Sequence, residues 1–311
     1  MFSFEDILKN CDRSLEAFSK QAEQYFIRHR RQIDTVINIL DDNESKYVYA
    51  QEISSLILRS FLQPQYASYI CGLISNKEFD NYVTSTSNHE MYSKIATYDN
   101  PIHILQKKYC IVTTFILEQY RYKNYVHVQK NDVCIDAGGC LGDTSLYFMQ
   151  NGAKEVYTFE IDKLNIDCLK GTVSINPYEK NIHIVESALA DREGIIKYLP
   201  DPTNPGAGRI VQENYPGAYD VPVTTVDRYC EEHDIQPSFI KMDIEGSEIN
   251  ALKGAKNTIL KYKPRLAICI YHSIDHRWEI PLLLKEWLPN YKFYVKKSHP
   301  FAETVLFGTP Y

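Results

Sequence analysis

The 311-residue chain has the composition of an ordinary globular protein: 34 Lys+Arg face 40 Asp+Glu, 44% of residues are hydrophobic, and there are 13 Gly and 14 Pro. These values exclude wholesale disorder and collagen-like repeats, and the length suffices for one large domain or two smaller ones. A net charge of -6 argues against a general nucleic-acid binder, which holds phosphates with clustered Lys and Arg, so we expect no nucleic-acid partner.

The N-terminal residues do not resemble a secretory signal, because acids already stand at Glu5 and Asp6. The longest charge-free stretch, residues 60–76, is 17 residues long and contains Pro64 and Gly72, so it is too polar and too broken to span a bilayer. The eight cysteines include no Cys-x-x-Cys pair, which favours reduced thiols over a zinc site or a disulfide framework. We expect a cytoplasmic protein without a membrane span.

Residues 1–120 are predicted to form a helical accessory region. Apolar residues recur there at spacings of three and four, as in Leu15, Phe18 and Ala22. Polar runs at 41–44 and 84–88 suit helix ends or loops. The region could serve as a lid, a homodimer surface or an acceptor-recognition module, and the sequence does not choose among these roles.

After residue 125 short β-branched runs begin to alternate with helix-like segments. The pattern predicts strands over 133–136, 155–161 and 182–189, with helices over 144–150 and 162–175. Repeated β-α-β units of this kind predict an α/β fold with a parallel sheet and right-handed crossovers.

An interruption follows before the α/β rhythm resumes. Strand-like runs at 195–199 and 219–226 flank the Pro- and Gly-rich segment 201–208, so we expect a β-excursion with a mobile loop near the sheet edge. The remaining predictions are strands over 239–244 and 265–271, helices over 247–262 and 278–287, and an antiparallel closing pair over 291–296 and 304–307.

The motif richest in chemistry is Asp136-Ala-Gly-Gly-Cys-Leu-Gly-Asp-Thr-Ser145, at the end of the first strand of the α/β part. Glycines let a backbone pass close to a ligand, and the following helix offers free N–H groups. Glu160 ends the second strand, where an acid accepts hydrogen bonds from both hydroxyls of a ribose. Together these residues predict a nucleoside-containing cofactor at the carboxyl edge of the sheet.

S-adenosylmethionine suits this motif better than NAD. The dinucleotide pattern Gly-x-Gly-x-x-Gly would need glycines where Cys140 and Asp143 stand. An acid at Asp136 would attract the sulfonium and amino groups of S-adenosylmethionine, whereas it would repel a phosphate.

The ordered set of motifs resembles the FkbM-type S-adenosylmethionine-dependent methyltransferases. The matching segments are the Asp136–Ser145 motif, Phe159-Glu160, Val223-Thr-Thr-Val-Asp227, Ile240-Lys-Met-Asp-Ile-Glu-Gly-Ser-Glu248, Ala251-Leu-Lys-Gly-Ala255, Tyr271-His272 and Ile280-Pro281. The resemblance covers about residues 120–311 and implies a methyltransferase domain over 121–311. Its sheet would be the Rossmann-like class I methyltransferase sheet of order 3-2-1-4-5-7-6, with the last strand antiparallel.

The resemblance implies a donor-binding set located in four turns of that domain. Gly138, Gly139 and Gly142 would line the methionine and ribose parts of the donor, with Asp136 near its amino group. The other implied donor-binding residues are Asp143, Thr144, Ser145, Glu160 for the ribose hydroxyls, Ile161 against adenine, Ser187 and Ala188 beside the adenine edge, and Asp243. Simple core packing is the alternative role for Ile161 and Ala188.

Three carboxylates lie close together after the fourth strand, at Asp243, Glu245 and Glu248. Such a cluster is costly unless it is solvated, protonated, hydrogen-bonded or metal-bound. Asp243 could face the sulfonium or the acceptor hydroxyl, Glu245 could position a substrate hydroxyl, and Glu248 could simply favour a helix dipole. Their oxygens could also hold Mg or Ca, so the sequence leaves the binding of a divalent metal as an alternative.

His272 ends the fifth strand, at the edge where the site is expected. An alcohol is a poor nucleophile until its proton is removed, and histidine is the usual general base near neutral pH. We therefore name His272, Asp243 and Glu245 as the candidate catalytic residues. A loop hydrogen bond is the alternative role of His272.

The leading hypothesis is an O-methyltransferase acting on a hydroxyl of a sugar, nucleotide sugar or glycan, as the family resemblance implies. The polar residues near the site and the 24 tyrosines suit sugar binding, although tyrosines are also common in cores and interfaces. The alternatives are a lipid, polyketide or peptide acceptor, a non-catalytic donor-binding scaffold, and an NAD-dependent enzyme.

Overall fold

The computed structural model describes residues 20–58, 77–81, 108–201, 208–211 and 215–310. By internal contacts the chain forms two compact units, residues 1–85 with 269–311 and residues 86–268. Leu15, Phe18, the turn at 84–88 and positions 202–207 of the expected mobile loop lie outside the described residues. The division at residues 120 and 121 stays a prediction.

The main sheet has seven strands in the order β10-β11-β9-β8-β1-β2-β3, which is the predicted 3-2-1-4-5-7-6 order. Its strands are β1 (Val133–Ala137), β2 (Glu155–Phe159), β3 (Ile182–Val185), β8 (Phe239–Met242), β9 (Arg265–Cys269), β10 (Lys292–Lys297) and β11 (Thr304–Thr309). β3, β2, β1, β8 and β9 pair in parallel, whereas β10 and β11 pair antiparallel. The predicted α/β fold is therefore confirmed.

The strands β1 and β8 lie at the centre of the unit formed by residues 86–268. Every residue of β8 is buried, and four of the five residues of β1 are buried, because helices cover parallel sheets on both faces. The helices in the described part of this unit are α8 (Lys108–Ile111), α9 (Asp143–Gln150), α10 (Lys163–Ser174), α11 (Val226–Glu232), α12 (Glu248–Lys253) and α13 (Lys256–Tyr262). A π-helical turn, η1 (Val112–Ile116), continues α8 and contacts α9.

The structure differs from the sequence prediction at two breaks. The run 182–189, predicted as one strand, divides into β3 and β4 (Ala188–Leu189), and β4 joins a second sheet. The predicted helix 247–262 divides at Gly254, where an added Cβ would lie 1.9 Å from the carbonyl oxygen of Ala190. Close backbone packing thus interrupts an otherwise helical pattern.

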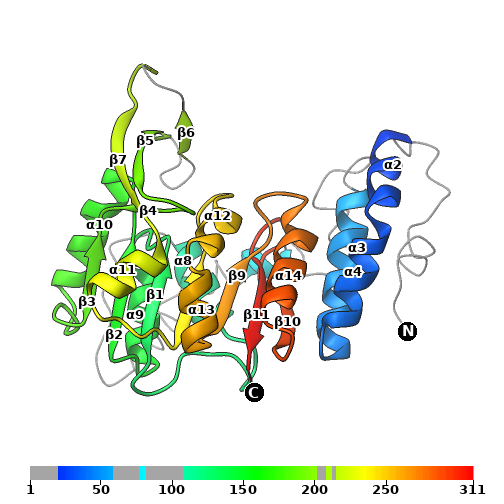
Figure 1. The fold of residues 1–311 in the computed structure, drawn as a ribbon, viewed down its shortest axis with the longest axis horizontal. Helices are drawn as coiled ribbons and strands as arrows, with labels where there is room; N and C mark the ends of the chain where they lie inside the picture. The colour runs from blue at the N-terminus through cyan, green and yellow to red at the C-terminus, as the bar shows by residue number, and fades with distance from the viewer. Residues whose placement is uncertain (1–19, 59–76, 82–107, 202–207, 212–214, 311) are drawn as a thin grey trace. The chain divides into compact units, whose positions relative to one another are not determined.

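The expected β-excursion is a four-stranded sheet of order β4-β7-β5-β6. It is built from β4, β5 (Gly194–Leu199), β6 (Arg209–Val211) and β7 (Tyr219–Thr224). β5 pairs antiparallel with both β6 and β7. In Figure 1 this ribbon extends away from β1, β2 and β3 of the main sheet.

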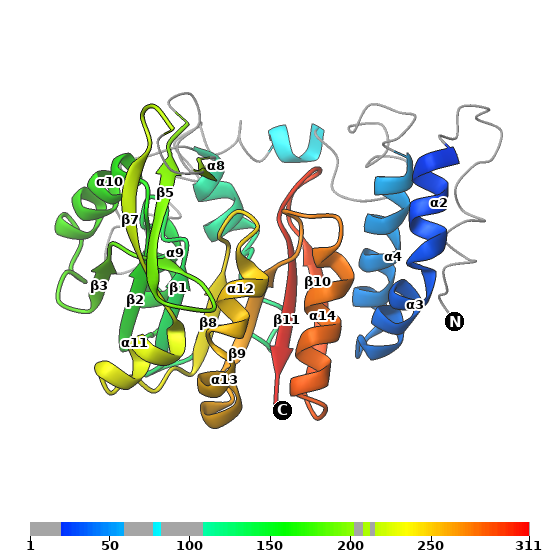
Figure 2. The same ribbon diagram turned by 45° about the horizontal axis from the view of Figure 1, so that its top comes forward.

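The other unit combines N-terminal helices with the end of the chain. α2 (Lys20–Arg28), α3 (Arg30–Ile39) and α4 (Asn43–Leu58) lie side by side in Figures 1 and 2. α3 contacts α14 (His276–Trp287), and α4 contacts β10. Ile33, Val36 and Ile53 are among the apolar side chains that these helices bury. No helix in the described ranges combines the length and apolar character that a bilayer crossing requires.

Candidate functional site

The turn between β1 and α9 carries the predicted glycine motif and needs glycine at three positions for steric reasons. Gly138 and Gly142 have φ angles of 85° and 89°, in the left-handed region that favours glycine. A Cβ on Gly138 would lie 1.9 Å from the carbonyl oxygen of Asp243, and a Cβ on Gly139 would lie 2.0 Å from the Thr158 hydroxyl. The glycines therefore bring this turn against its neighbouring strands.

Asp136, at the end of β1, is completely buried. Its Oδ1 lies 3.0 Å from Nζ of Lys241, and its Oδ2 accepts a hydrogen bond of 2.7 Å from the Ser145 hydroxyl. Its negative charge is thus offset within the protein, and it ties β1 to the first turn of α9. Contact of Asp136 with a donor amino group stays a prediction.

Lys241 lies beside the glycine turn, and the sequence did not single it out. It lies on β8 with only 1% of its side chain exposed. Beyond its pair with Asp136, its ammonium donates to the carbonyl oxygens of Ala137 at 3.2 Å and Gly138 at 2.6 Å. It also lies 5.2 Å from the ring centroid of Tyr120, in cation–π geometry. A lysine inside an otherwise apolar strand was the signal that could have revealed it.

Glu160 follows β2 and closes the glycine turn from the other side. Its carboxylate accepts backbone hydrogen bonds from Cys140 at 2.8 Å, Ile161 at 2.7 Å and Asp162 at 2.9 Å. Burial raises the pKa of Glu160, and these three hydrogen bonds oppose the rise. The structure therefore brings Glu160 to the glycine turn, as predicted, and fixes its orientation there.

Two tyrosines of the second sheet support the turn after Glu160. Tyr198 donates to the carboxylate of Asp162 at 3.1 Å, and Tyr219 donates to the carbonyl oxygen of Ile161 at 3.0 Å. Ser187 donates to the carbonyl oxygen of Pro222 at 3.0 Å. The excursion is thus bonded to the segment predicted to face adenine.

Ala188 and Thr144 complete the positions predicted near the donor. Ala188 begins β4 and is partly exposed, whereas Thr144 is buried in the first turn of α9. Contact of either residue with a donor stays a prediction.

Asp143 begins α9 with a buried carboxylate. It accepts a 2.6 Å hydrogen bond from Thr114, which lies in η1. Burial raises the pKa of Asp143 to about 6, against the opposing effects of the Thr114 hydrogen bond and of the Lys241 charge. An ionised acid at this helix N-terminus disfavours a pyrophosphate, which would need the same positive end of the helix dipole.

The turn after β8 contains the three clustered acids. Asp243 is partly exposed, and its Oδ2 accepts a 2.7 Å hydrogen bond from the Tyr120 hydroxyl. Glu248 is completely buried, and its Oε1 accepts from the backbone N–H of Ile244 at 2.9 Å and of Gly246 at 3.4 Å. Glu245 is exposed, with φ of 52°. Glu248 therefore stabilises the turn, and the catalytic roles of Asp243 and Glu245 stay predictions.

His272 lies three residues after β9 ends, in the unit that contains residues 269–311. β9 pairs in parallel with β8, in a register that places Met242 opposite Ile268. The carboxyl ends of parallel neighbours share one edge, where ligands of such sheets bind. The place of His272 in the site and its role as a base both stay predictions.

The strand order and the glycine turn define the class I methyltransferase fold. A family model described as the methyltransferase FkbM domain matches residues 136–295, which is 160 of 311 residues. The chain therefore belongs to the FkbM methyltransferase family.

Among solved structures, a methyltransferase FkbM from Methylobacillus flagellatus KT is 19% identical, with a TM-score of 0.59 over 92% of this chain and 60% of that chain. This chain thus spans about 60% of that protein's length. An rRNA methylase from Streptococcus thermophilus is 11% identical, over 58% of this chain and 87% of that chain, with a TM-score of 0.38. Fibrillarin from Aeropyrum pernix, with natively bound S-adenosyl-L-methionine, is also 11% identical. The match covers 62% of this chain and 71% of that chain, with a TM-score of 0.36. No protein of curated function matches the sequence.

Proposed function

We propose that this protein is an S-adenosylmethionine-dependent O-methyltransferase that acts on a hydroxyl of a sugar or glycan. The observation that carries the methyltransferase assignment is the family match over residues 136–295, which includes the glycine turn, Glu160 and Asp243. The acceptor class rests on the family resemblance and on the polar character of the turn after β8.

The chemistry of the donor site fits S-adenosylmethionine better than a pyrophosphate cofactor. Acidic groups surround the glycine turn at Asp136, Asp143 and Glu160. Among the described residues that bond to this turn, Lys241 is the one basic side chain, and it pairs with Asp136. Glu160 is oriented by three backbone N–H groups, so its carboxylate is preorganised to hold ribose hydroxyls. Ile161, Ser187 and Ala188 would lie along adenine.

The bound donor would supply an electrophilic methyl group on a cationic sulfur. Asp243 or His272 would remove the acceptor proton, and Glu245 would hold an acceptor hydroxyl in place. Most of the rate acceleration would come from placing the acceptor oxygen in line with the methyl group and from excluding water. Tyr120 would keep Asp243 oriented through its 2.7 Å hydrogen bond.

The described tyrosines give limited support for a saccharide acceptor. Tyr120, Tyr198 and Tyr219 make hydrogen bonds within the protein, so they are structural. Tyr125 and Tyr215 are 54% and 47% exposed, and exposed aromatic rings of this kind can stack on sugar rings. A lipid, polyketide or peptide acceptor is the alternative proposal.

The test is incubation of the full chain with methyl-labelled S-adenosylmethionine and separate pools of nucleotide sugars, glycan extracts, lipids, peptides and RNA, followed by mass analysis. We expect label in a saccharide pool and formation of S-adenosylhomocysteine. Label in protein, lipid or nucleic acid without label in a saccharide would overturn the acceptor assignment. Binding of the donor without any turnover would instead favour a scaffold role. A parallel incubation with EDTA tests for a divalent metal.

A further inference from the structure

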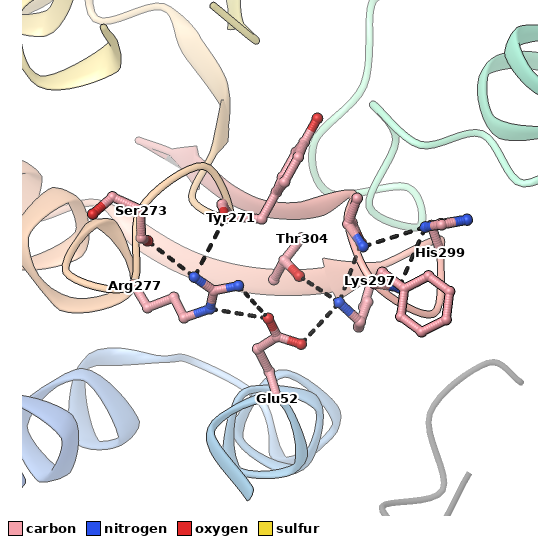
Figure 3. A network of polar contacts seen from close by, with 9 residues as sticks. Glu52, Tyr271, Ser273, Arg277, Lys297, His299 and Thr304 are labelled. Atoms are coloured by element: carbon pink, nitrogen blue, oxygen red, sulfur yellow. Dashed lines mark hydrogen bonds and ion pairs between the residues drawn. The ribbon is translucent and has the colours of Figure 1, made fainter. Parts of the chain in front are cut away.

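Three charged side chains meet in the interior of the unit formed by residues 1–85 and 269–311 (Figure 3). Glu52 comes from α4, Arg277 from α14 and Lys297 from β10, and their side chains are 0%, 3% and 1% exposed. Arg277 donates to Oε1 of Glu52 through Nε at 2.9 Å and Nη2 at 2.6 Å. Lys297 lies 2.8 Å from Oε2. Both carboxylate oxygens of Glu52 are therefore held by cations.

The remaining arm of Arg277 reaches the loop that contains His272. Its Nη1 donates to the carbonyl oxygen of Ser273 at 2.9 Å and to that of Tyr271 at 3.4 Å, as Figure 3 shows. These two carbonyls belong to the residues directly before and after His272. Because a guanidinium is planar and its donors have fixed directions, orienting it through Glu52 also orients its contacts with this loop.

Lys297 prevents Glu52 from rotating away from Arg277. Its ammonium also donates to the carbonyl oxygen of Ala302 at 3.1 Å and to the Thr304 hydroxyl at 3.1 Å. Thr304 begins β11. The carboxylate of Glu52 is therefore linked to the sheet through Lys297 and to the His272 loop through Arg277.

The N-terminal helices make a second link to the same loop. The Tyr25 hydroxyl of α2 donates to the carboxylate of Asp275, three residues after His272. Two different helices of the predicted accessory region thus bond to residues 271–277.

We propose that Glu52 is a positioning residue for His272, acting through Arg277. The N-terminal helical region then contributes to the active site by fixing the backbone on both sides of the candidate base. This inference rests on the proposed function for its catalytic consequence, because it assumes that His272 acts on the acceptor. Its structural part, that the Glu52–Arg277 pair sets the place of His272, stands on the geometry alone.

The rival explanation is that the ion pair only attaches the helices to the sheet. Asp41 provides a matched control, because it attaches the same helices elsewhere in the same unit. Its carboxylate accepts from the backbone N–H of Phe293 at 2.6 Å, and its own N–H donates to the carbonyl oxygen of Phe293 at 2.9 Å. Asp41→Asn weakens this attachment without touching residues 271–273.

The test uses Arg277→Lys in the full chain, with Glu52→Gln as the second variant. Lysine keeps the charge beside Glu52, but a single ammonium cannot reproduce the fork that reaches both carbonyls. The first readout is the His272 signal in NMR spectra of protein labelled at histidine Cε1, assigned with His272→Gln. The second readout is kcat for methyl transfer from S-adenosylmethionine to the saccharide that accepts the label in the test above. The Kd for S-adenosylhomocysteine is measured in parallel.

We expect both variants to shift or broaden the His272 signal, to lower kcat at least tenfold and to leave the Kd within twofold, while Asp41→Asn leaves the signal and kcat in place. An unchanged His272 signal in both folded variants overturns the inference, and so does an equal change in Asp41→Asn. If the wild-type protein transfers no methyl group, the proposed function fails, and the NMR signal still decides whether Glu52 positions His272.

Discussion

The ammonium of Lys241 lies 3.0 Å from the carboxylate of Asp136, and both side chains are sealed from solvent. The pair joins β8 to β1 at the point where the glycine turn begins. Lys241 extends this role by donating to the carbonyl oxygens of Ala137 and Gly138. A single buried cation therefore binds a carboxylate and two carbonyl oxygens at the start of the glycine turn.

Replacing Lys241 with Met should destabilise the fold strongly. The change removes one partner of a buried pair and leaves the Asp136 carboxylate uncompensated, which costs about 3–5 kcal/mol. Urea denaturation measures this loss. The double variant Lys241→Met with Asp136→Asn removes both charges, so it should recover a large part of the stability. Equal stability of Lys241→Met and the wild type would show that the pair contributes nothing.

Gly138→Ala should weaken both the fold and donor binding. An added Cβ would lie 1.9 Å from the carbonyl oxygen of Asp243, at a residue whose φ is 85°. Strain in this backbone region costs about 1–3 kcal/mol, and the collision adds to it. Unfolding curves and calorimetric titration with S-adenosylmethionine would measure the two effects.

Gly194→Ala is the matched control for this change. Gly194 begins β5, is exposed, and has nothing within 4 Å of an added Cβ. Its substitution should leave both stability and donor affinity unchanged. Similar losses in the two variants would contradict the steric explanation.

The sequence predicted the parallel sheet well because β-branched runs and glycine turns are local signals. The strand order was implied by the resemblance to the FkbM family, whereas the positions of the glycine turn, Glu160 and Asp243 followed from the local signals and from the family motifs. The role of Lys241 did not, because its partner lies 105 positions earlier in the chain. The same holds for Glu52 and Arg277, whose pairing joins residues 225 positions apart. Periodicity carries no information about which distant charges meet in a core.

Asp143 should make the stability of the protein depend on pH between about 4 and 6. Burial raises its pKa from the ordinary 3.8 to about 6, so the folded protein binds this proton more tightly than the unfolded chain. The stabilising contribution is therefore complete below pH 3.8 and is lost as the pH rises through 6. A shift of about two pKa units corresponds to about 3 kcal/mol.

Asp143→Asn should remove this dependence. Its stability relative to the wild type should increase from pH 4 to pH 7 in urea denaturation series, because the amide stays neutral and still accepts from Thr114. Thr114→Val should raise the pH at which this stability is lost above the wild-type value, because the Thr114 hydrogen bond lowers the pKa of Asp143. Parallel stability curves for Asp143→Asn and the wild type would refute the assignment.

His272→Ala should lower kcat by about 10²–10⁴-fold if the imidazole removes the acceptor proton. Donor affinity should stay the same, because His272 is not among the residues expected to contact the donor. Asp243→Asn should differ by weakening donor binding as well, since its carboxylate is expected near the sulfonium. Tyr120→Phe serves as the control for Asp243, because it keeps the carboxylate and removes the hydroxyl that donates to it at 2.7 Å and accepts from the Gln119 amide at 3.1 Å. A rate within about twofold of the wild type for His272→Ala would assign the proton transfer to Asp243 instead.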